Sequence, residues 1–421
     1  MQMAKSTTLY ALVGTLLITA SGNVLTAEDW PCWRGPKHDG VSVEKGWLTT
    51  WPKDGLKQLW KVDVGRGYST VSVSGGKIYT MGNSKDQETV YCLNANTGET
   101  LWKHSYPCSK SSCPKALYGI SPRATPVVDG ACVYTVGLAG QLFCLDCGSG
   151  KVIWNKDLTK DFNLELPNEG FSGSPLIEGT ILLLNAGSTG LALDKKTGNV
   201  VWKSEGASSF ASPVAFTLAD RRCVAFFAAT QLVVVALADG KPIAACDWKT
   251  RSGCNCSDPV IVGDRVFVAA GYGMGSALLE IRQGRIANVW KKNFGCVFAS
   301  CVLMGDHLYG LFDSGWEKAD LVCLSAKDGS EKWRQKDVGA GGLMAADGKL
   351  LVLGRKGDLI LADAAPDSYK ELARAKVFPE ETVNGKPSPA GCWSNPVLCN
   401  GRIYVRNEKG SLLCLDARGA K

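Results

Sequence analysis

Residues 93–102 read Leu93-Asn94-Ala95-Asn96-Thr97-Gly98-Glu99-Thr100-Leu101-Trp102. Two later segments have the same order of residue types, Leu145-Asp146-Cys147-Gly148-Ser149-Gly150-Lys151-Val152-Ile153-Trp154 and Leu193-Asp194-Lys195-Lys196-Thr197-Gly198-Asn199-Val200-Val201-Trp202. Each copy joins an apolar strand to a short Trp-bearing strand through a polar turn with glycine, and weaker copies bring the total to eight. The copies recur roughly every 40–50 residues, which is the period of a propeller blade with four short strands. The sequence therefore predicts an all-β fold, an eight-bladed β-propeller of four-stranded antiparallel blades.

The two ends of the repeat region predict how the ring closes. The last copy stops at Lys421 without a Trp-bearing fourth strand, whereas a spare strand with Trp60 occurs at residues 58–64. We expect this N-terminal strand to complete the last blade, because closure removes the open sheet edge. The propeller then spans residues 58–421. A seven-bladed ring is the alternative, because the copy at residues 363–377 lacks both the glycine and the tryptophan.

The residues before the ring divide into two segments. Lys5 precedes an apolar stretch at residues 9–20, which is too short to span a membrane and is typical of a secretory signal. We expect residues 1–27 to be a signal peptide and the mature chain to be exported, without a lipid anchor because no Cys begins it. Residues 28–57 form an extension with four tryptophans, Trp30, Trp33, Trp47 and Trp51. They are expected to pack across the propeller surface, and an aromatic ligand-binding patch is the alternative.

Charge and cysteine content narrow the class of partner. The net charge of +7 is spread along the chain without a Lys/Arg run, so nucleic-acid binding is not indicated. Export would permit disulfides among the 17 cysteines, and the best candidate pair is Cys108 with Cys113, which would close a short loop. Four other cysteines share one strand position in different copies and are expected to be small core residues; they are Cys92, Cys144, Cys323 and Cys414.

The segment Asn94-Ala95-Asn96-Thr97-Gly98-Glu99-Thr100-Leu101-Trp102 resembles the tryptophan-docking repeat of the pyrroloquinoline-quinone (PQQ) propeller superfamily. The resemblance covers about residues 58–421. It implies that each indole docks on the neighbouring blade, with Trp60, Trp102, Trp154, Trp202, Trp248, Trp290 and Trp333 in this role. Residues 29–42 are similar to the opening of exported PQQ-like repeat proteins of planctomycete type, which are often described as BamB-like.

The residues that precede each inner strand are expected to converge at one end of the central channel. Aligned on a recurring Pro-Val step, they are Tyr68, Arg123, Phe210, Asp258, Phe298, Trp393 and Asn395. Aromatic side chains with a few charged and amide groups favour a pocket for a small ligand. The alternative is a plugged, hydrogen-bonded channel mouth in which Arg123 and Asp258 neutralise each other.

The superfamily resemblance leaves three functions open, because a fold does not define a reaction. Its quinoprotein dehydrogenases imply PQQ, calcium, an Asp base, an Arg near the quinone and usually two adjacent cysteines, whereas the closest cysteines here are Cys254-Asn255-Cys256. We therefore expect no catalytic residue, no metal and no cofactor, but a non-catalytic scaffold that binds protein or polymer partners in the cell envelope, with peripheral membrane association left open. One alternative is a PQQ- and calcium-dependent dehydrogenase with Asp258 as base and Arg123 as electrostatic helper. The other is a carbohydrate-binding propeller that uses Trp393 and the tryptophans of the extension.

Overall fold

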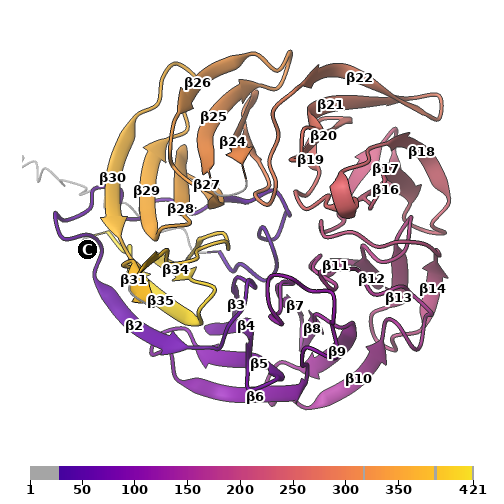
Figure 1. Cartoon of the computed structure of the whole chain (residues 1–421), viewed down its shortest axis with the longest axis horizontal. Coiled ribbons are helices and arrows are strands. Elements are labelled where there is room, and N and C mark those ends of the chain that lie inside the picture. Colours follow the sequence, from indigo (N-terminus) through magenta and orange to yellow (C-terminus); the bar gives the residue numbers. More distant parts are fainter. Residues whose placement is uncertain (1–27, 316–317, 384–385, 420–421) are drawn as a thin grey trace, which may run out of the picture.

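The computed structural model describes residues 28–315, 318–383 and 386–419. Eight sheets are arranged as a ring around a central channel (Figure 1), so the predicted eight-bladed, all-β propeller is confirmed. The one described helix is the 3-10 turn η1 (Arg251–Gly253). The signal peptide predicted for residues 1–27 lies outside the described residues.

Each blade is antiparallel, and in seven of them the strands follow one another in chain order from the channel to the rim. Blades 1 to 4 are β3 (Ser72–Ser74), β4 (Lys77–Ser84), β5 (Gln87–Asn94), β6 (Thr100–Pro107); β7 (Val127–Asp129), β8 (Cys132–Val136), β9 (Gln141–Asp146), β10 (Val152–Asp157); β11 (Leu176–Glu178), β12 (Ile181–Leu184), β13 (Leu191–Asp194), β14 (Val200–Lys203); and β15 (Val214–Leu218), β16 (Arg221–Phe227), β17 (Gln231–Ala236), β18 (Pro242–Asp247). Blades 5 to 8 are β19 (Val260–Val262), β20 (Arg265–Ala270), β21 (Gly275–Arg282), β22 (Arg285–Lys292); β23 (Val302–Met304), β24 (His307–Gly315), β25 (Lys318–Ser325), β26 (Glu331–Gln335); β27 (Gly341–Ala346), β28 (Lys349–Gly354), β29 (Asp358–Asp363), β30 (Glu371–Lys376); and β33 (Val397–Cys399), β34 (Arg402–Arg406), β35 (Ser411–Asp416), β2 (Gln58–Asp63).

The ring closes as expected. Strand β2 pairs antiparallel with β35 and places Trp60 opposite Cys414. The segment without the motif glycine and tryptophan still forms a complete blade 7, and β1 (Val41–Ser42) adds to it in parallel. Blade number therefore follows from the apolar strand pattern, which is intact there, and not from the docking residues.

The polar turn of the motif has a local explanation. The side chain of its first polar residue accepts backbone N–H groups two or three residues on, as in Ser149 N to Asp146 Oδ1 at 2.7 Å and Thr197 N to Asp194 Oδ1 at 2.9 Å. Such Asx turns reverse the chain without help from elsewhere. A β-bulge then occurs between the third and fourth strands of all eight blades. A bulge re-aims side chains, and here it lies next to the docking position.

Six tryptophans dock as the resemblance implied. Their Nε1 groups donate to backbone oxygens of the following blade, at 2.8–3.2 Å, from Trp60, Trp102, Trp154, Trp202, Trp290 and Trp333 to Ala95, Cys147, Lys195, Leu237, Ala326 and Ala365. The carbonyl of Lys195 also accepts the hydroxyl of Tyr134 at 3.1 Å, so one acceptor satisfies two part-buried donors. The four cysteines expected in the core, at positions 92, 144, 323 and 414, are all buried.

Trp248 differs from the expectation and is corrected here. Ala244 lies opposite Val234 at the docking position of blade 4, and Trp248 comes after the end of β18. Its buried Nε1 has no hydrogen-bond partner among the described residues. The ring instead packs edge-on against Phe227, with centroids 6.0 Å apart, beneath the ammonium group of Lys291. The register of β18 therefore removes Trp248 from the docking position, and its ring packs instead within the apolar cluster shared by blades 4 and 5.

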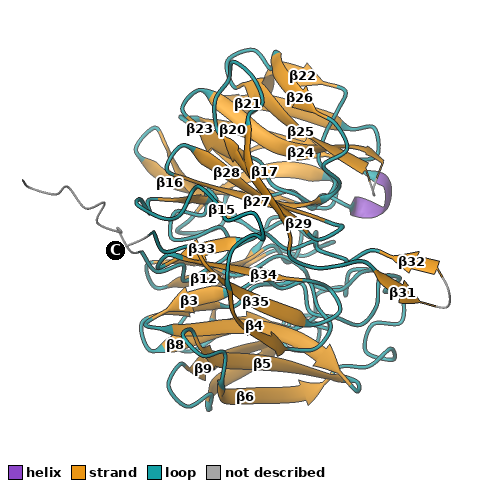
Figure 2. Cartoon of the chain, turned by 90° about the vertical axis from the view of Figure 1, so that its left-hand side faces the viewer, coloured by secondary structure: helices purple, strands orange, loops and turns teal. Residues whose placement is uncertain are grey.

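The extension runs beneath the ring and across the channel. Its backbone meets successive blades, with Trp30 at Val73, Pro31 at Val128, β1 at β27 and Trp47 at Arg418. Trp30 and Trp47 are 2% and 4% exposed, so they pack against the ring and form no exposed aromatic patch. In Figure 2, η1 and the hairpin of β31 (Glu381–Val383) and β32 (Lys386–Ser388) lie on one side of the disc and the C-terminus on the other. No helix in the described part of the chain is long and apolar enough to cross the hydrophobic thickness of a membrane.

Candidate functional site at the channel mouth

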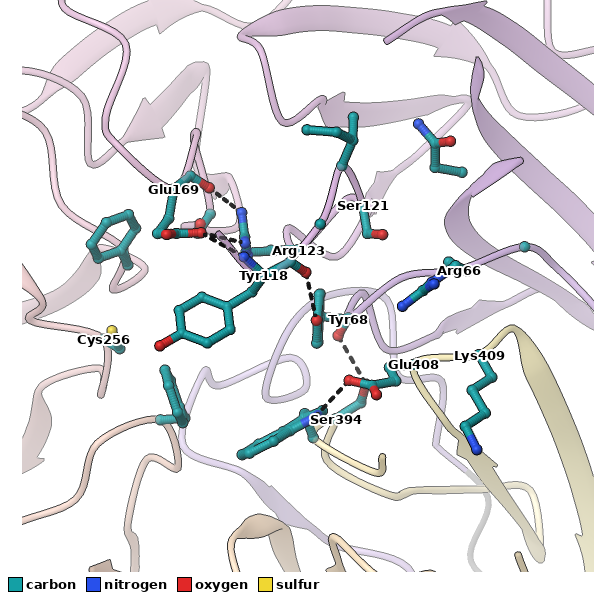
Figure 3. A pocket seen from close by; sticks show the side chains of 18 of the residues that line it. Arg66, Tyr68, Tyr118, Ser121, Arg123, Glu169, Cys256, Ser394, Glu408 and Lys409 are labelled. Carbon is teal, nitrogen blue, oxygen red and sulfur yellow. Dashed lines mark hydrogen bonds and ion pairs between the residues drawn. The ribbon is translucent and has the colours of Figure 1, made fainter. Parts of the chain in front are cut away.

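One cavity of about 1090 Å³ occupies the channel mouth, and Trp33 of the extension is among the residues that line it. Six of the seven residues expected at the channel mouth line it, namely Tyr68, Arg123, Phe210, Asp258, Phe298 and Trp393. The seventh, Asn395, is 7% exposed and does not line the cavity; its carbonyl accepts the Thr70 hydroxyl at 2.8 Å. The inner-strand alignment therefore identifies one face of the ring, and Figure 3 shows Tyr68 and Arg123 beside each other in the cavity.

A belt of hydrogen bonds beneath the cavity joins neighbouring blades. In each step, a backbone N–H before an inner strand donates to the side-chain oxygen at the equivalent position of the next blade. The steps run from Thr70 to Thr125, Ser174, Ser212, Asp258 and Ser300, with distances of 2.6–3.2 Å. The repeated small hydroxyl residues before the Pro-Val step are thus structural, because they satisfy buried amide groups.

Asp258 is the acidic member of this belt. Its Oδ1 accepts the Ser212 amide at 2.6 Å, and its Oδ2 accepts Nε1 of Trp33 at 2.5 Å. The Arg34 side chain, 1% exposed, lies 3.9 Å from the same oxygen. Burial raises the pKa of Asp258 above its ordinary value, and Arg34 and the N–H donors oppose that shift. Asp258 therefore fastens the extension to the ring.

Arg123 does not pair with Asp258, so that part of the plugged-mouth hypothesis is wrong. Its Nη2 lies 3.0 Å from Oε2 of Glu169, its Nη1 donates to the Glu169 carbonyl, and its guanidinium covers the Tyr68 ring at 5.6 Å. Glu169 in turn accepts the backbone N–H of Leu117 at 3.0 Å. The ion pair thus holds the long loop between blades 1 and 2 against the loop between blades 2 and 3.

A second carboxylate organises the opposite wall. Glu408 accepts Nε1 of Trp393 at 2.9 Å, and Figure 3 shows it close to Tyr68. Burial and the Glu408 charge raise the pKa of Tyr68 to about 12, so this phenol stays protonated at neutral pH. The Trp393 ring is covered by the Arg355 guanidinium at 4.9 Å and meets Phe298 at 5.5 Å between centroids.

Several lining residues escaped sequence reasoning. Glu169, Glu408, Leu117 and Tyr118 lie in loops between strands, at no fixed offset from the repeated motif. The one signal was the Cys108–Cys113 loop, whose two thiols are buried beside Ala116 and anchor the segment that carries Leu117. Both cysteines are thiols in the structure, and the disulfide between them remains a prediction.

The site does not suit the calcium and base chemistry of a dehydrogenase. Both oxygens of Asp258 already hold N–H donors, so this carboxylate is free neither to bind calcium nor to take a proton from a substrate. Arg123 is likewise committed to Glu169. In the part of the chain that the structure describes, no three His, Cys, Asp or Glu side chains are placed to hold a metal together.

A circular β-propeller with tryptophan-docked blades and a loop-lined channel mouth is the class that these observations define. The family model described as outer membrane protein assembly factor BamB matches residues 86–335 and 317–421. The chain therefore belongs to this family.

Curated relatives come from both branches of the superfamily. Quinohemoprotein alcohol dehydrogenase ADH-IIG of Pseudomonas putida is 28% identical over 157 residues, which are 35% of this chain and 21% of that protein. Outer membrane protein assembly factor BamB of Moranella endobia is 25% identical over 218 residues, 51% of each chain. The matched regions thus span between about a fifth and a half of these two relatives.

Solved structures share the fold at low identity. BamB from Moraxella catarrhalis has a TM-score of 0.61 at 15% identity, with 87% of this chain and 99% of that chain covered. Quinohemoprotein alcohol dehydrogenase from Comamonas testosteroni has a TM-score of 0.67 at 13% identity, with 93% and 81% covered. At such identity the likeness establishes architecture alone.

Proposed function

We propose that this chain is an exported, non-catalytic scaffold that binds protein partners in the cell envelope. Membership of the BamB family supports this role and this location, because the family model and the Moranella endobia relative are named as outer membrane protein assembly factors. The observation that carries the proposal is that the ionisable side chains at the channel mouth form structural hydrogen bonds and ion pairs. Arg123, Glu169 and Glu408 hold loops and aromatic rings in place, which is the work of a binding surface.

The test is partner capture by the full mature chain immobilised on a resin, with chemical crosslinking in an envelope extract. A captured protein is then purified, and its affinity for the propeller is measured by calorimetry. The proposal expects saturable binding of a defined protein. It fails if no envelope protein binds above the level seen with an unrelated propeller of similar size and charge.

The dehydrogenase alternative needs a separate measurement. Tryptophan fluorescence of the pure protein is titrated with PQQ, with and without calcium, and dye reduction is followed with alcohols and aldose sugars. The scaffold proposal expects neither calcium-dependent quenching nor turnover, since Asp258 is fully hydrogen-bonded. Turnover that is lost in Asp258→Asn would replace the scaffold with an enzyme.

The carbohydrate alternative rests on Trp393 alone once the extension tryptophans are known to be buried or engaged. Sugar rings stack on open indole faces, but the Trp393 ring already carries Arg355. We therefore propose weak or no retention on polysaccharide columns. Retention that disappears in Trp393→Ala would favour the carbohydrate function instead.

A further inference from the structure

Three large apolar side chains are exposed around the channel mouth. Leu117, Tyr118 and Tyr272 are 83%, 43% and 47% exposed, and all three line the cavity. Leaving a leucine or an aromatic side chain in water forgoes about 1.5–3 kcal/mol of burial. Apolar groups gathered at one concave site are typical of a surface that a partner covers.

The ledge that presents Leu117 and Tyr118 is held rigidly. Glu169 accepts both backbone amides, at 3.0 Å and 3.5 Å, and the Tyr68 hydroxyl donates to the Tyr118 carbonyl at 2.9 Å (Figure 3). The preceding residue, Ala116, is buried, and its carbonyl accepts the ammonium group of Lys110. The two exposed side chains are therefore pre-organised, which lowers the entropy lost when a partner binds.

Arg66 is the cation that favours an anionic group on one wall, which it shares with the exposed side chains of Asp63, Lys85 and Asp86. Glu169 and Glu408 are engaged by Arg123 and Trp393. Arg66, by contrast, has no hydrogen-bonded or ion-paired side-chain partner within residues 28–315, 318–383 and 386–419, and Figure 3 shows it at the edge of the cavity. Its side chain is exposed.

A buried cation reinforces this wall. Arg406 is 1% exposed and donates to the carbonyls of Ser69, Met81 and Gly65 at 2.7–3.1 Å, with no carboxylate in contact among the described residues. Burial lowers its pKa to about 10, so it is charged at neutral pH. Asp63, which attracts Arg406 at longer range, is exposed and accepts the Gly65 amide. A positive charge in a low-dielectric wall projects its field into the adjacent cavity.

We infer that the channel mouth binds an extended segment of a partner polypeptide. A bulky apolar side chain of that segment enters the cavity between Leu117, Tyr118 and the wall of Phe298 and Trp393, and a neighbouring Asp or Glu faces Arg66. The cavity, about 1090 Å³, slightly exceeds the usual range for small-molecule sites, roughly 300–1,000 Å³, and has room for several residues of an extended chain. This inference rests on the proposed scaffold function and identifies the channel mouth as the surface that binds the partner.

The test uses fluorescence anisotropy of the full mature chain with labelled, Gly/Ser-rich peptides. One peptide carries a central Asp-Phe pair, a second replaces Phe with Ser, and a third replaces Asp with Lys. We expect saturable binding of the Asp-Phe peptide, about tenfold or more weaker binding without Phe, and about fivefold weaker binding with Lys. The Arg66→Gln variant should remove most of the difference between the Asp and Lys peptides.

Variants of the ledge supply the structural control. Leu117→Ser should weaken binding of the Asp-Phe peptide about tenfold. It should not lower the thermal stability of the protein, because the Leu117 side chain is solvent-exposed. Leu101→Ser is the matched control, an exposed leucine on the outer strand β6. The inference is overturned if no peptide binds, if the Lys peptide binds best, or if Leu117→Ser binds as the parent does.

The two proposals fail in different ways. A captured envelope protein that binds Leu117→Ser and the parent equally well would leave the scaffold function intact and place its docking surface elsewhere. Peptide binding at the mouth without any captured envelope protein would instead overturn the scaffold function and leave a peptide site.

Discussion

At the scale of single residues, the structure of the channel mouth depends on buried charged side chains that are already hydrogen-bonded or ion-paired. Asp258 and Arg34 are 3% and 2% exposed. Removing one partner of a buried charged pair leaves the other without compensation, which costs more than the pair itself contributes. Such residues resemble catalytic groups in sequence, and only their contacts show that they hold the molecule together.

The Asp258→Asn variant tests this role. The amide oxygen can still accept the Ser212 N–H, but Arg34 loses its counter-charge, so the free energy of unfolding should fall by about 2–4 kcal/mol. Denaturant unfolding followed by tryptophan fluorescence measures it. Ser212→Ala, which removes only a belt hydroxyl, should cost about 1 kcal/mol. Equal losses in the two variants would argue against a special role for the Arg34 charge.

Glu88 gives the protein a specific pH dependence. It is fully buried in β5, its oxygens accept the Leu138 amide at 3.2 Å, and burial raises its pKa from 4.5 to about 7. Because the folded-state pKa is above the ordinary one, its contribution to stability is fully present below about pH 4.5 and is lost as pH rises through about 7.

We therefore expect Glu88→Gln to differ little from the parent at pH 5 and to be more stable by about 2–3 kcal/mol at pH 8. Urea unfolding across this pH range is the measurement. Glu165→Gln, at an exposed carboxyl, is the control and should leave the pH profile unchanged. A parallel profile for parent and Glu88→Gln would show that Glu88 does not titrate in this range.

At the scale of elements, the blade seam depends on glycine where an indole approaches the turn. Gly150 has φ +71°, and a Cβ there would lie 2.5 Å from the Trp102 ring. We expect Gly150→Ala to destabilise the protein by about 2–4 kcal/mol, from the left-handed backbone and the steric overlap together. Gly130 also has positive φ, but nothing lies within 4 Å of its would-be Cβ. Gly130→Ala should cost only about 1 kcal/mol, and thermal unfolding compares the two.

The docking seam also distinguishes tryptophans that look alike in sequence. Trp154→Phe removes an indole N–H that donates to the part-buried carbonyl of Lys195 at 3.1 Å, so a loss of about 1–2 kcal/mol is expected. Trp248→Phe removes an N–H with no partner and should cost less. Chemical denaturation of both variants checks the order. A larger loss for Trp248→Phe would mean that its ring packing outweighs a docking bond.

At the scale of the whole molecule, the extension connects blades that are not adjacent in the ring. Ring closure by itself brings only adjacent blades into contact. The extension contacts blades 1, 2, 5, 6, 7 and 8 through bonds that include Trp33 to Asp258 and Arg34 to the Cys301 carbonyl at 2.7 Å. The ring should therefore lose stability, but not its strands, when the extension is shortened.

Deletion of residues 28–46 tests that expectation. The deletion leaves the strands of all eight four-stranded blades in the chain, so the circular dichroism spectrum should remain that of a β protein. The melting temperature should fall by about 5 °C or more, because Asp258 and Arg34 contacts and the burial of Trp30 are lost. Calorimetry measures the change. An unchanged melting temperature would show that the extension rests on the ring without stabilising it.

Blade number, closure of the ring by β2 and the six docking indoles could be predicted from the sequence because they depend on local order. Asx turns, turn glycines and strand alternation act within a few residues, and the apolar strand pattern recurs in all eight copies, including the one that lacks the motif glycine. The channel mouth could be read only in part, since the alignment of inner strands locates a face but not the partners on it. The docking role predicted for Trp248 is wrong because Ala244, four residues earlier, occupies the docking position of β18, and composition alone does not fix that register.

The roles of Asp258 and Glu169 came from tertiary contacts. Trp33 and Asp258 are 225 positions apart, and Arg123 and Glu169 come from different loops. No local pattern specifies such pairs, because they form only when ring closure brings the loops and the extension to one channel. Short-range backbone chemistry thus determines the propeller, whereas long-range burial and charge pairing determine what its mouth presents to a partner.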